Sequence, residues 1–403
     1  MSIPKMRFHG YDSPWKVSKL GELFEIYSGN TPSRSDRNNY DNGTIPWIKT
    51  TDLNNSLIYV NEEKITDHGA KKLKTLPKNT ILIAMYGGFN QIGRTGLLTY
   101  PATINQALAS LLPVKEINSY FLLNYLNLRK DSWRNVAASS RKDPNITKKN
   151  VEKFKISFPS LEEQSAIGSL FRTLDDLLAS YKDNLTNYQS LKVTTLSKMF
   201  PKAGQTIPEI RLDGFEGEWE VKELGDVVEF YSGLTYKPSD VVSSGTLVLR
   251  SSNVRDGELI YKDNVFVNPD IVNCQYVKLG DIVVVVRNGS RDLIGKHALI
   301  KSEMPNSVIG AFMTGVKSDR PEFVNALLDT KVFVSEINKN LGSTINQITT
   351  GNFKRMKFSF PTKEEQQAIG SYFSNLDNLI AAHQEKISQL ETLKKKLLQD
   401  MFV

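Results

Sequence analysis

The chain has 403 residues, of which 40% are hydrophobic and 24% charged, a balance typical of folded globular domains and not of disordered chains. Lys and Arg number 51 against 44 Asp and Glu, and the formal net charge of +7 permits a polyanionic partner without requiring one. The single cysteine, Cys274, excludes a disulfide within the chain and a cysteine zinc cluster, and favours a reducing cytoplasm.

The first residues, Met1 to Lys5, lack the apolar core of a signal peptide. No apolar run approaches the roughly 20 residues that a membrane-spanning helix needs, and the run Ile282 to Val286 has only the length of a strand. We therefore expect a cytoplasmic chain without a membrane segment.

Residues 1–155 are predicted to form a first front block of mixed α and β structure. A β-rich run over Thr80–Met85 lies between the turn signals Leu76-Pro77-Lys78-Asn79 and Tyr86-Gly87-Gly88. An apolar pattern over Tyr120–Leu128 predicts a helix later in the block.

Residues 156–200 are predicted to form a helical spacer, most of which is one long helix. Pro159 lies just before it, where proline is tolerated, and Glu162 and Glu163 suit the positive end of the helix dipole. Apolar residues then recur three and four positions apart, in a heptad-like stripe that has to be buried. The stripe consists of Ile167, Phe171, Leu174, Leu178, Tyr181, Leu185, Tyr188 and Leu191. About 38 residues make a rod of roughly 57 Å, which acts as a spacer as well as an association surface.

The same order of elements is predicted for the rest of the chain. Residues 201–218 are expected to be a connector, because they contain Pro208, Gly214 and Gly217. A second front block over residues 219–357 has a β-rich run over 281–287 and a helical pattern over 323–334. A second long helix follows over residues 358–403, and its stripe consists of Ile369, Phe373, Leu376, Ile380, His383, Ile387, Leu390, Leu397 and Met401.

The two halves are copies of one unit. Landmarks recur at an offset of 202 to 204 residues, the spacing of Pro159 from Pro361 and of Trp15 from Trp219. From Lys155 to Phe200, 21 of 46 positions are identical to those of the second copy, whereas the front blocks agree only at scattered anchors. This division favours an arrangement in which two similar helical scaffolds carry two different binding surfaces. The less favoured explanation is that the sequence of a duplicated fold simply drifted. The two equivalent helices are each other's most obvious partner.

The sequence carries no catalytic motif. A phosphate-binding Gly-x-x-x-x-Gly-Lys-Ser/Thr loop, an Asn/Asp-Pro-Pro-aromatic run and a dinucleotide Gly-x-Gly-x-x-Gly after a strand are all absent. The four histidines are scattered without metal-ligand spacing, and Cys274 is expected in the core. We therefore expect no catalytic residue, no metal site and no cofactor in this chain.

The divergent front blocks contain matched polar and basic loops that have the side chains to read DNA. Arg and Lys bind guanine edges or phosphates, and Asn and Gln bind adenine edges. Ordinary solvated loops are the alternative for any single residue. The candidates are Arg34, Arg37, Lys49, Thr50, Tyr86, Asn90, Gln91 and Arg94 in the first block, and Tyr236, Lys237, Arg250, Ser251, Asn253, Arg287, Asn288, Arg291 and Lys296 in the second.

These features together resemble the specificity subunits of type I restriction-modification systems. The anchors that carry the resemblance in the first front block, each with a second copy, are Trp15, Leu20-Gly21 and Tyr27-Ser28-Gly29. The motif Phe-Pro-x-x-Glu-Glu-Gln-x-Ala-Ile-Gly opens each long helix, and the run from Ile207 to Trp219 resembles the family's entry into its second recognition domain.

The resemblance implies an α+β fold with two target recognition domains, each followed by a long helix, and the two helices paired as an antiparallel coiled coil. Each domain would read one half of an asymmetric double-stranded DNA site, and the coiled coil would set the gap between the half-sites. Two methyltransferase subunits would bring S-adenosylmethionine for adenine methylation, and restriction subunits would add ATP- and Mg-dependent cleavage. The candidates for docking these subunits or for forming the coiled coil are Glu162, Glu163, Gln164, Ile167, Phe171, Leu174, Glu364, Glu365, Gln366, Ile369, Phe373 and Leu376.

Two other functions stay open at the level of sequence. One is a coiled-coil scaffold whose front blocks bind proteins. Salt-dependent binding to duplex DNA in the presence of a methyltransferase subunit separates it from the DNA reader, because phosphate contacts make binding salt-dependent. A nuclease would cut DNA as the isolated chain with magnesium.

Overall fold

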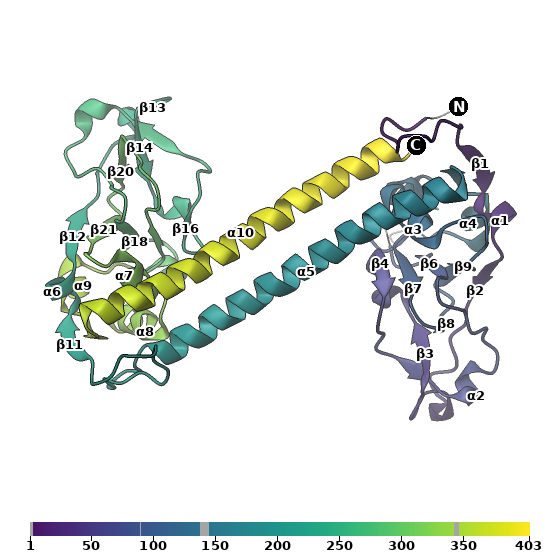
Figure 1. Ribbon diagram of the computed structural model, residues 1–403, viewed down its shortest axis with the longest axis horizontal. Coiled ribbons are helices and arrows are strands. Elements are labelled where there is room, and N and C mark those ends of the chain that lie inside the picture. Colours follow the sequence, from purple (N-terminus) through teal and green to yellow (C-terminus); the bar gives the residue numbers. More distant parts are fainter. Residues whose placement is uncertain (1–2, 89, 138–144, 342–345) are drawn as a thin grey trace. The chain divides into compact units, whose positions relative to one another are not determined.

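The computed structural model describes residues 3–88, 90–137, 145–341 and 346–403. The chain forms two compact units: unit 1 comprises Met1–Lys182 with Lys386–Val403, and unit 2 comprises Asp183–Glu385. Each unit therefore combines one front block with parts of both long helices (Figure 1).

Three small sheets form the front block of unit 1. The strand orders are β2-β9-β6-β7-β4, β5-β3-β8 and β1-β10, and the pairs β4–β7 and β3–β8 are parallel whereas the others are antiparallel. The run expected over Thr80–Met85 is the buried central strand β6. The strands are β1 Lys16–Lys19, β2 Ile26–Ser28, β3 Ile45–Ile48, β4 Ser56–Ile58, β5 Lys64–Ile65, β6 Ile81–Ala84, β7 Thr95–Leu98, β8 Thr103–Ile104, β9 Leu108–Leu111 and β10 Lys155–Phe158.

The helices of unit 1 are short except for α3 and α5. The expected helix over Tyr120–Leu128 is α3, whose first turn is capped by Asn118, since its Oδ1 accepts hydrogen bonds from the amides of Tyr120 and Phe121. The helices are α1 Leu20–Leu23, α2 Asp67–Ala70, α3 Ser119–Leu128, α4 Lys148–Lys153 and α5 Leu161–Met199, with 3₁₀ turns η1 Arg37–Asn39, η2 Thr50–Asp52 and η3 Lys130–Asn135.

Unit 2 repeats the sheets of unit 1. Its strand orders β12-β21-β18-β19, β13-β17-β14-β20 and β11-β22 correspond to β2-β9-β6-β7, β5-β3-β8 and β1-β10, and β15 pairs with β16 in addition. The strands are β11 Glu220–Glu223, β12 Glu229–Ser232, β13 Val241–Val242, β14 Thr246–Leu249, β15 Val254–Arg255, β16 Glu258–Leu259, β17 Val265–Val267, β18 Ile282–Val285, β19 His297–Leu299, β20 Ser307–Ile309, β21 Met313–Lys317 and β22 Lys357–Phe360.

The single helical pattern expected over residues 323–334 is two helices, α7 and α8. The chain leaves α7 at Asp329, and Thr330 caps α8 by accepting a hydrogen bond from the amide of Phe333 at 3.2 Å. Both helices bury apolar residues in the same core, which explains why the periodicity continues across the break. The helices of unit 2 are α6 Leu224–Val227, α7 Pro321–Leu328, α8 Lys331–Asn340, α9 Thr350–Arg355 and α10 Lys363–Met401, with 3₁₀ turns η4 Pro238–Asp240, η5 Ser251–Asn253, η6 Pro269–Ile271 and η7 Arg291–Leu293.

The two long helices, α5 and α10, have 39 residues each and begin directly after the expected prolines. In unit 1 the buried residues Ile167, Phe171 and Leu174 of α5 share a core with Leu390 and Met401 of α10. In unit 2 the later part of α5 shares a core with the early part of α10. No helix in the described part of the chain has both the length and the apolar character to cross a membrane.

One residue of the predicted stripe lies elsewhere. Leu191 was expected to be buried but is 44% exposed, whereas Leu196 and Met199 are buried. A straight helix has 3.6 residues per turn and drifts away from a strict 3.5-residue repeat. After Tyr188 the inward face therefore passes through Lys192, whose ammonium lies 2.7 Å from carboxylate oxygens of Asp329 and Asp377.

Candidate nucleic-acid interface

A buried ion pair joins each front block to its long helix. In unit 1 the guanidinium of Arg7 donates two hydrogen bonds to Glu163, at 2.8 and 2.6 Å, and Glu163 is 1% exposed. In unit 2 Arg211 donates two hydrogen bonds of 2.7 Å to Glu365, which is 0% exposed. A bidentate pair fixes both distance and orientation. The Glu-Glu-Gln motifs therefore hold each helix to its block.

The glutamine of each motif has an internal role as well. Gln164 accepts a hydrogen bond from the amide of Asn118 at 2.9 Å and donates to the carbonyls of Glu116 and Pro159. Gln366 donates to the carbonyl of Pro361 at 2.9 Å. Each glutamine therefore bonds the backbone carbonyl of the proline that precedes its long helix.

The docking prediction needs correction on this point. Glu163, Gln164, Glu365 and Gln366 are buried inside their units, and so are Ile167, Phe171, Leu174, Ile369, Phe373 and Leu376. Their side chains pack within the chain and form no exposed docking surface, while the coiled-coil half of the prediction stays a prediction. Of the predicted docking residues, only Glu162 and Glu364 are exposed.

Two matched glycines explain other repeated landmarks. A Cβ on Gly29 would lie 1.8 Å from the carbonyl oxygen of Ile104, and one on Gly233 would lie 2.1 Å from that of Gly310. Only glycine permits so close an approach of two backbones. The Tyr-Ser-Gly landmarks therefore mark the place where each block folds against the strand β8 or β20.

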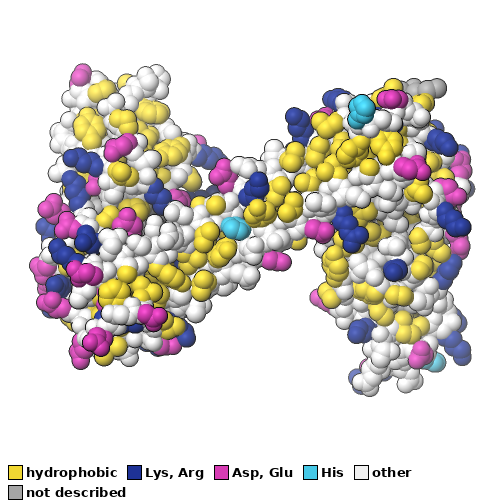
Figure 2. All heavy atoms as spheres, viewed as in Figure 1, with side chains coloured by type: hydrophobic (Ala, Val, Ile, Leu, Met, Phe, Trp, Pro, Cys, Tyr) yellow, Lys and Arg dark blue, Asp and Glu magenta, His cyan; other side chains and the backbone are white. Residues whose placement is uncertain are grey.

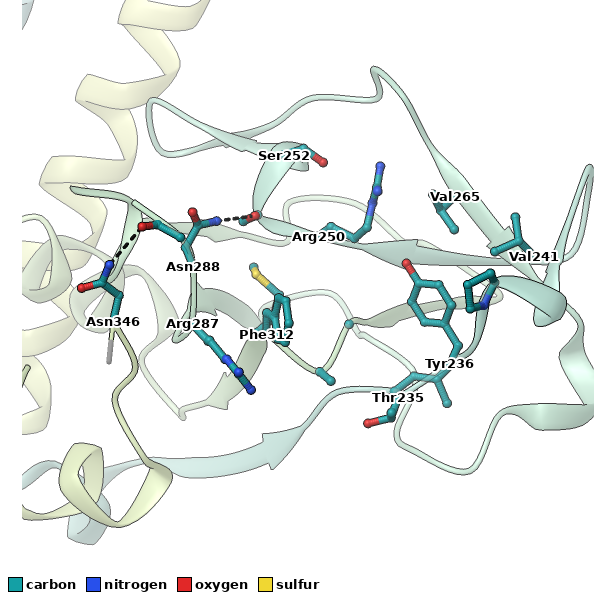
Figure 3. A pocket seen from close by; sticks show the side chains of 17 residues that line it. Thr235, Tyr236, Val241, Arg250, Ser252, Val265, Arg287, Asn288, Phe312 and Asn346 are labelled. Atoms are coloured by element: carbon teal, nitrogen blue, oxygen red, sulfur yellow. Dashed lines mark hydrogen bonds between the residues drawn. The ribbon is translucent and has the colours of Figure 1, made fainter. Parts of the chain in front are cut away.

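A cavity of about 1170 Å³ opens in unit 2 between η4, η5 and the loop after β18. Figure 3 shows Tyr236, Arg250, Arg287 and Phe312 around it. Five predicted contact residues line this cavity, namely Tyr236, Arg250, Ser251, Arg287 and Asn288. The structure thus brings together side chains from positions 236 to 288 that the sequence placed in three separate loops.

Two arginines and an aromatic ring dominate the chemistry of this cavity. The guanidinium of Arg287 lies 5.0 Å from the ring centroid of Phe312, which is 52% exposed. Arg250 donates from Nη2 to the carbonyl oxygen of Asp263 at 2.5 Å, and its Nε is buried without a hydrogen-bond partner among the described residues. Guanidinium groups bind phosphates and guanine edges, and exposed aromatic rings stack on bases.

The cavity wall is held by amide side chains. Asn288 donates to Ser251 Oγ at 2.9 Å and accepts from the amide of Ser290, while Asn346 donates to the carbonyl of Gly289 at 3.0 Å (Figure 3). The amide of Asn288 is therefore already engaged, and this residue shapes the wall of the cavity.

The other candidates of the second block lie outside this cavity. Asn253 is 0% exposed, and its amide donates to the carbonyl of Ile260 at 3.0 Å while its Oδ1 accepts from the amide of Arg250. The prediction of Asn253 as a contact residue is therefore wrong, because this residue caps η5 from inside the fold. Lys237 is exposed at the start of η4.

Arg291 and Lys296 line a second cavity of about 360 Å³. It also contains His297, whose Nε2 lies 3.3 Å from Asp329, and Asp329 in turn lies 2.7 Å from Lys192. Burial acts to raise the pKa of Asp329, but the hydrogen bond and charge of His297 and the charge of Lys192 prevail and lower it to about 2.

The corresponding place in unit 1 holds an internal salt bridge. The carboxylate of Glu63 pairs with the guanidinium of Arg34 and lies 2.7 Å from Nζ of Lys49. Arg34 also lies over two rings, 4.4 Å from the centroid of Tyr40 and 5.1 Å from that of Trp47. The hydrogen bond from Arg34 and the charge of Lys49 lower the pKa of Glu63, so this carboxylate stays ionised near neutral pH.

The remaining candidates of unit 1 are spread over separate loops. Arg37 is exposed at the start of η1, and Thr50 is half-buried in η2. Tyr86 and Asn90 are exposed, and Gln91 and Arg94 are half-buried. Phe89, in the middle of the glycine-rich loop, lies outside the described residues.

The comparisons with known proteins agree with one family. The family model of the type I restriction modification DNA specificity domain matches residues 12–213 and 216–392. The chain belongs to the type I restriction-modification DNA specificity family. Membership in this specificity family implies a non-catalytic role for the chain, and the domain matches once in each half, as the internal repeat predicts.

Two specificity subunits are similar to this chain in sequence. The MjaVIII specificity subunit of Methanocaldococcus jannaschii is 26% identical over 411 residues, which cover 97% of this chain and 93% of the relative. The EcoR124I/EcoR124II specificity subunit of Escherichia coli is 29% identical over 175 residues, or 42% of this chain and 43% of the relative.

The fold is similar to that of two solved structures. The crystal structure of an S subunit from M. genitalium covers 100% of this chain and 99% of its own, with a TM-score of 0.67 and 16% identity. A structure described as the basis of complex assembly and conformational transition of the type I R-M system has a TM-score of 0.51 at 16% identity, and covers 98% of this chain and 99% of its own.

The cavity of this specificity-family chain contains residues that the sequence did not single out. Phe312, Asn346 and Val265 line it, and Glu63 closes its counterpart in unit 1. An exposed phenylalanine is visible only in the folded chain, and Glu63 becomes the counterpart of Val265 only once the strand register is known. Figure 2 shows basic and acidic side chains interspersed on the drawn face of each unit, so net charge alone points to no single surface.

Proposed function

We propose that the two units of this specificity-family chain read the two halves of a bipartite, asymmetric site in double-stranded DNA. The observation that carries the proposal is the open cavity of unit 2, in which Arg250 and Arg287 lie beside the exposed ring of Phe312. The closed counterpart in unit 1 makes the two readers different, and different readers select a non-palindromic site. The protein-binding scaffold receives no support from the comparisons.

We further propose that α5 and α10 form the antiparallel coiled coil that separates the two readers. Contacts within each unit support this pairing. In unit 1 Asp175 of α5 pairs with Lys394 of α10, and in unit 2 Lys192 of α5 pairs with Asp377 of α10 at 2.7 Å. In unit 2 the ring of Tyr188 also lies 5.1 Å from that of His383. As the residue number rises along α5, it falls along α10, as in an antiparallel pair.

The partners are proposed from the family. Two methyltransferase subunits would bind S-adenosylmethionine and methylate adenine, and restriction subunits would add ATP- and Mg-dependent cleavage in a cytoplasmic complex. The exposed first turns with Glu162 and Glu364 are equivalent in the two halves, and equivalent surfaces fit two copies of one partner.

Methylation mapping tests the proposed function. A host that carries this gene with its methyltransferase partner is expected to show methylated adenines in one split, non-palindromic sequence, and a host that lacks the gene is expected to lose them. Methylation that does not depend on the gene, or a palindromic site without a gap, would refute the proposal.

A matched deletion tests the spacer. Removal of residues 183–189 from α5 and residues 381–387 from α10 takes out about two turns of each helix, or roughly 10 Å. The gap between the half-sites is expected to shrink by about three base pairs, at 3.4 Å each, while the bases of each half-site stay the same. An unchanged gap with unchanged half-sites would show that the helices do not set the spacing.

A further inference from the structure

At one matched position beside the candidate interface, one front block has an acidic residue and the other an apolar residue. In unit 1 Ile45 pairs with Ile65 across β3 and β5, and in unit 2 Thr246 pairs with Val267 across β14 and β17. Two residues earlier on the second strand of each pair, this register places Glu63 opposite Trp47 and Val265 opposite Val248. Glu63 and Val265 are therefore structural equivalents, one acidic and one apolar.

In unit 1 the acidic residue neutralises the nearby cations. Glu63 is mostly buried, binds Arg34, and lies 2.7 Å from Lys49, the counterpart of Arg250 at the start of the matched 3₁₀ turn. Two cationic side chains thus share one carboxylate, and the aromatic rings of Tyr40 and Trp47 cover the guanidinium. A phosphate that approached this place would compete with an anion of the protein's own.

In unit 2 the apolar residue leaves the cations uncompensated. Val265 lines the cavity together with Arg250 and Arg287. In the described part of the chain, no carboxylate oxygen lies within ion-pair distance of either arginine, although Arg250 donates to the carbonyl of Asp263. The same place in the fold therefore holds a closed ion pair in one copy and an open cationic cavity in the other.

We propose that the Glu63/Val265 position sets how strongly each reader engages DNA: the cavity of unit 2 binds the phosphates and base edges, while Glu63 competes with DNA for Arg34 and Lys49 in unit 1. The proposal rests on the proposed DNA-reading function. It makes unit 2 the main source of salt-dependent affinity, since affinity falls with salt in proportion to the number of phosphates neutralised.

Reciprocal variants at this position test the proposal in the complex of the chain with its methyltransferase partner. The affinity for a duplex that carries the mapped site is measured between 50 and 200 mM salt for the wild type, Glu63→Gln and Val265→Glu. Glu62→Gln removes a neighbouring exposed carboxylate and controls for net charge, and Val265→Gln controls for size and polarity without charge.

Glu63→Gln is expected to raise the affinity at low salt about tenfold and to steepen the slope of log K against log salt by about 1 to 2, because two cations become available to phosphates. Val265→Glu is expected to lower the affinity about tenfold and to flatten the slope by about 1. Glu62→Gln and Val265→Gln are expected to stay within about threefold of the wild type.

Three results would overturn the proposal. A lower affinity for Glu63→Gln would mean that the carboxylate orients Arg34 for DNA and does not compete with it. Equal gains for Glu62→Gln and Glu63→Gln would reduce the effect to net charge, and an unchanged slope for Val265→Glu would exclude the cavity as the phosphate site. Thermal melting identifies a variant that fails to fold, and Val265→Glu tests the proposal independently of Glu63. If the wild-type complex shows no salt-dependent binding to DNA, the proposed function itself is refuted, and not only this inference.

Discussion

The joint between block and helix is the same in both units, whereas the surface beside η2 and η5 is not. At the joint, Arg7–Glu163 and Arg211–Glu365 repeat one bidentate ion pair with hydrogen bonds of 2.6 to 2.8 Å. Beside the two 3₁₀ turns, Glu63 closes one copy and Val265 leaves the other open. A duplicated fold can thus keep its frame identical while its two readers diverge.

The ends of the long helices are also bound in the same way in both units. Phe402, at the end of α10, lies 5.2 Å from the ring of Phe121 in unit 1, and Phe200, after α5, lies 5.5 Å from that of Phe323 in unit 2. Met6 donates its amide hydrogen to the carbonyl of Asp400, as Ile210 does to that of Lys198. Each block is therefore closed by the end of the long helix that follows the other block in sequence.

The largest expected loss of stability comes from removing one ring from either of these aromatic clusters. Phe402→Ala and Phe200→Ala are each expected to lower the free energy of unfolding of their own unit by about 3–5 kcal/mol, because each leaves a cavity among buried rings. Hydrogen exchange followed by mass spectrometry in urea assigns the loss to a unit. Loss of protection in unit 2 upon Phe402→Ala, with unit 1 unaffected, would contradict the equivalence. The exposed Phe312→Ala is the control.

The joint ion pairs provide a matched test of similar design. Glu163→Gln and Glu365→Gln each leave a mostly buried guanidinium without its carboxylate, at an expected cost of about 3 kcal/mol in unfolding free energy. The neighbouring exposed residues supply the controls, and Glu162→Gln and Glu364→Gln are expected to change stability by less than about 0.5 kcal/mol. Denaturant unfolding measures all four variants. Unequal costs for the two buried pairs would show that the joints are not equivalent.

One carboxylate of unit 2, Asp329, is expected to make that unit sensitive to acid. Asp329 and His297 of unit 2 take the places of Asn127 and Thr95 in unit 1, which form a neutral hydrogen bond of 2.6 Å. Since the folded pKa of Asp329 is about 2, below its ordinary value of 3.8, its stabilisation is present above pH 4 and is lost as the pH falls through 2.

The expected loss is at most about 2–3 kcal/mol, because the folded pKa of Asp329 is about 2 and its ordinary value is 3.8. Burial raises the pKa of Asp377, so this residue acts in the opposite direction and reduces the net effect. Hydrogen exchange of unit 2 between pH 2 and 5 measures the loss, and Asp329→Asn is expected to abolish it. An acid loss in unit 2 that persists unchanged in Asp329→Asn would contradict the assignment to Asp329.

The smallest change in the free energy of unfolding is expected for Leu191, in the apolar stripe of α5. Leu191→Lys is expected to change the unfolding free energy by less than about 0.5 kcal/mol, because the side chain is 44% exposed. The buried Leu196→Ala is expected to cost about 2–3 kcal/mol. Thermal and urea unfolding compare the two. A cost for Leu191→Lys as large as that for Leu196→Ala would restore the heptad assignment of Leu191.

The sequence by itself determined the frame of this protein. The repeat, the prolines before the long helices and the acidic first turns predict features that depend on local chain geometry and on residues close in sequence. The strand β6 and the helix α3 also follow from local periodicity. The break between α7 and α8 does not, because both helices bury apolar residues in the same core.

Only the tertiary structure decided which candidate residues reach a common surface. Arg250 and Arg287 line one cavity because β14 and β18 bring distant loops together, whereas Asn253, three residues from Arg250, is fully buried. The docking motif was recognised in the sequence, but its Glu163 and Glu365 bind arginines more than 150 positions away. Burial and charge neutralisation depend on such long-range neighbours, and the pattern along the chain does not contain them.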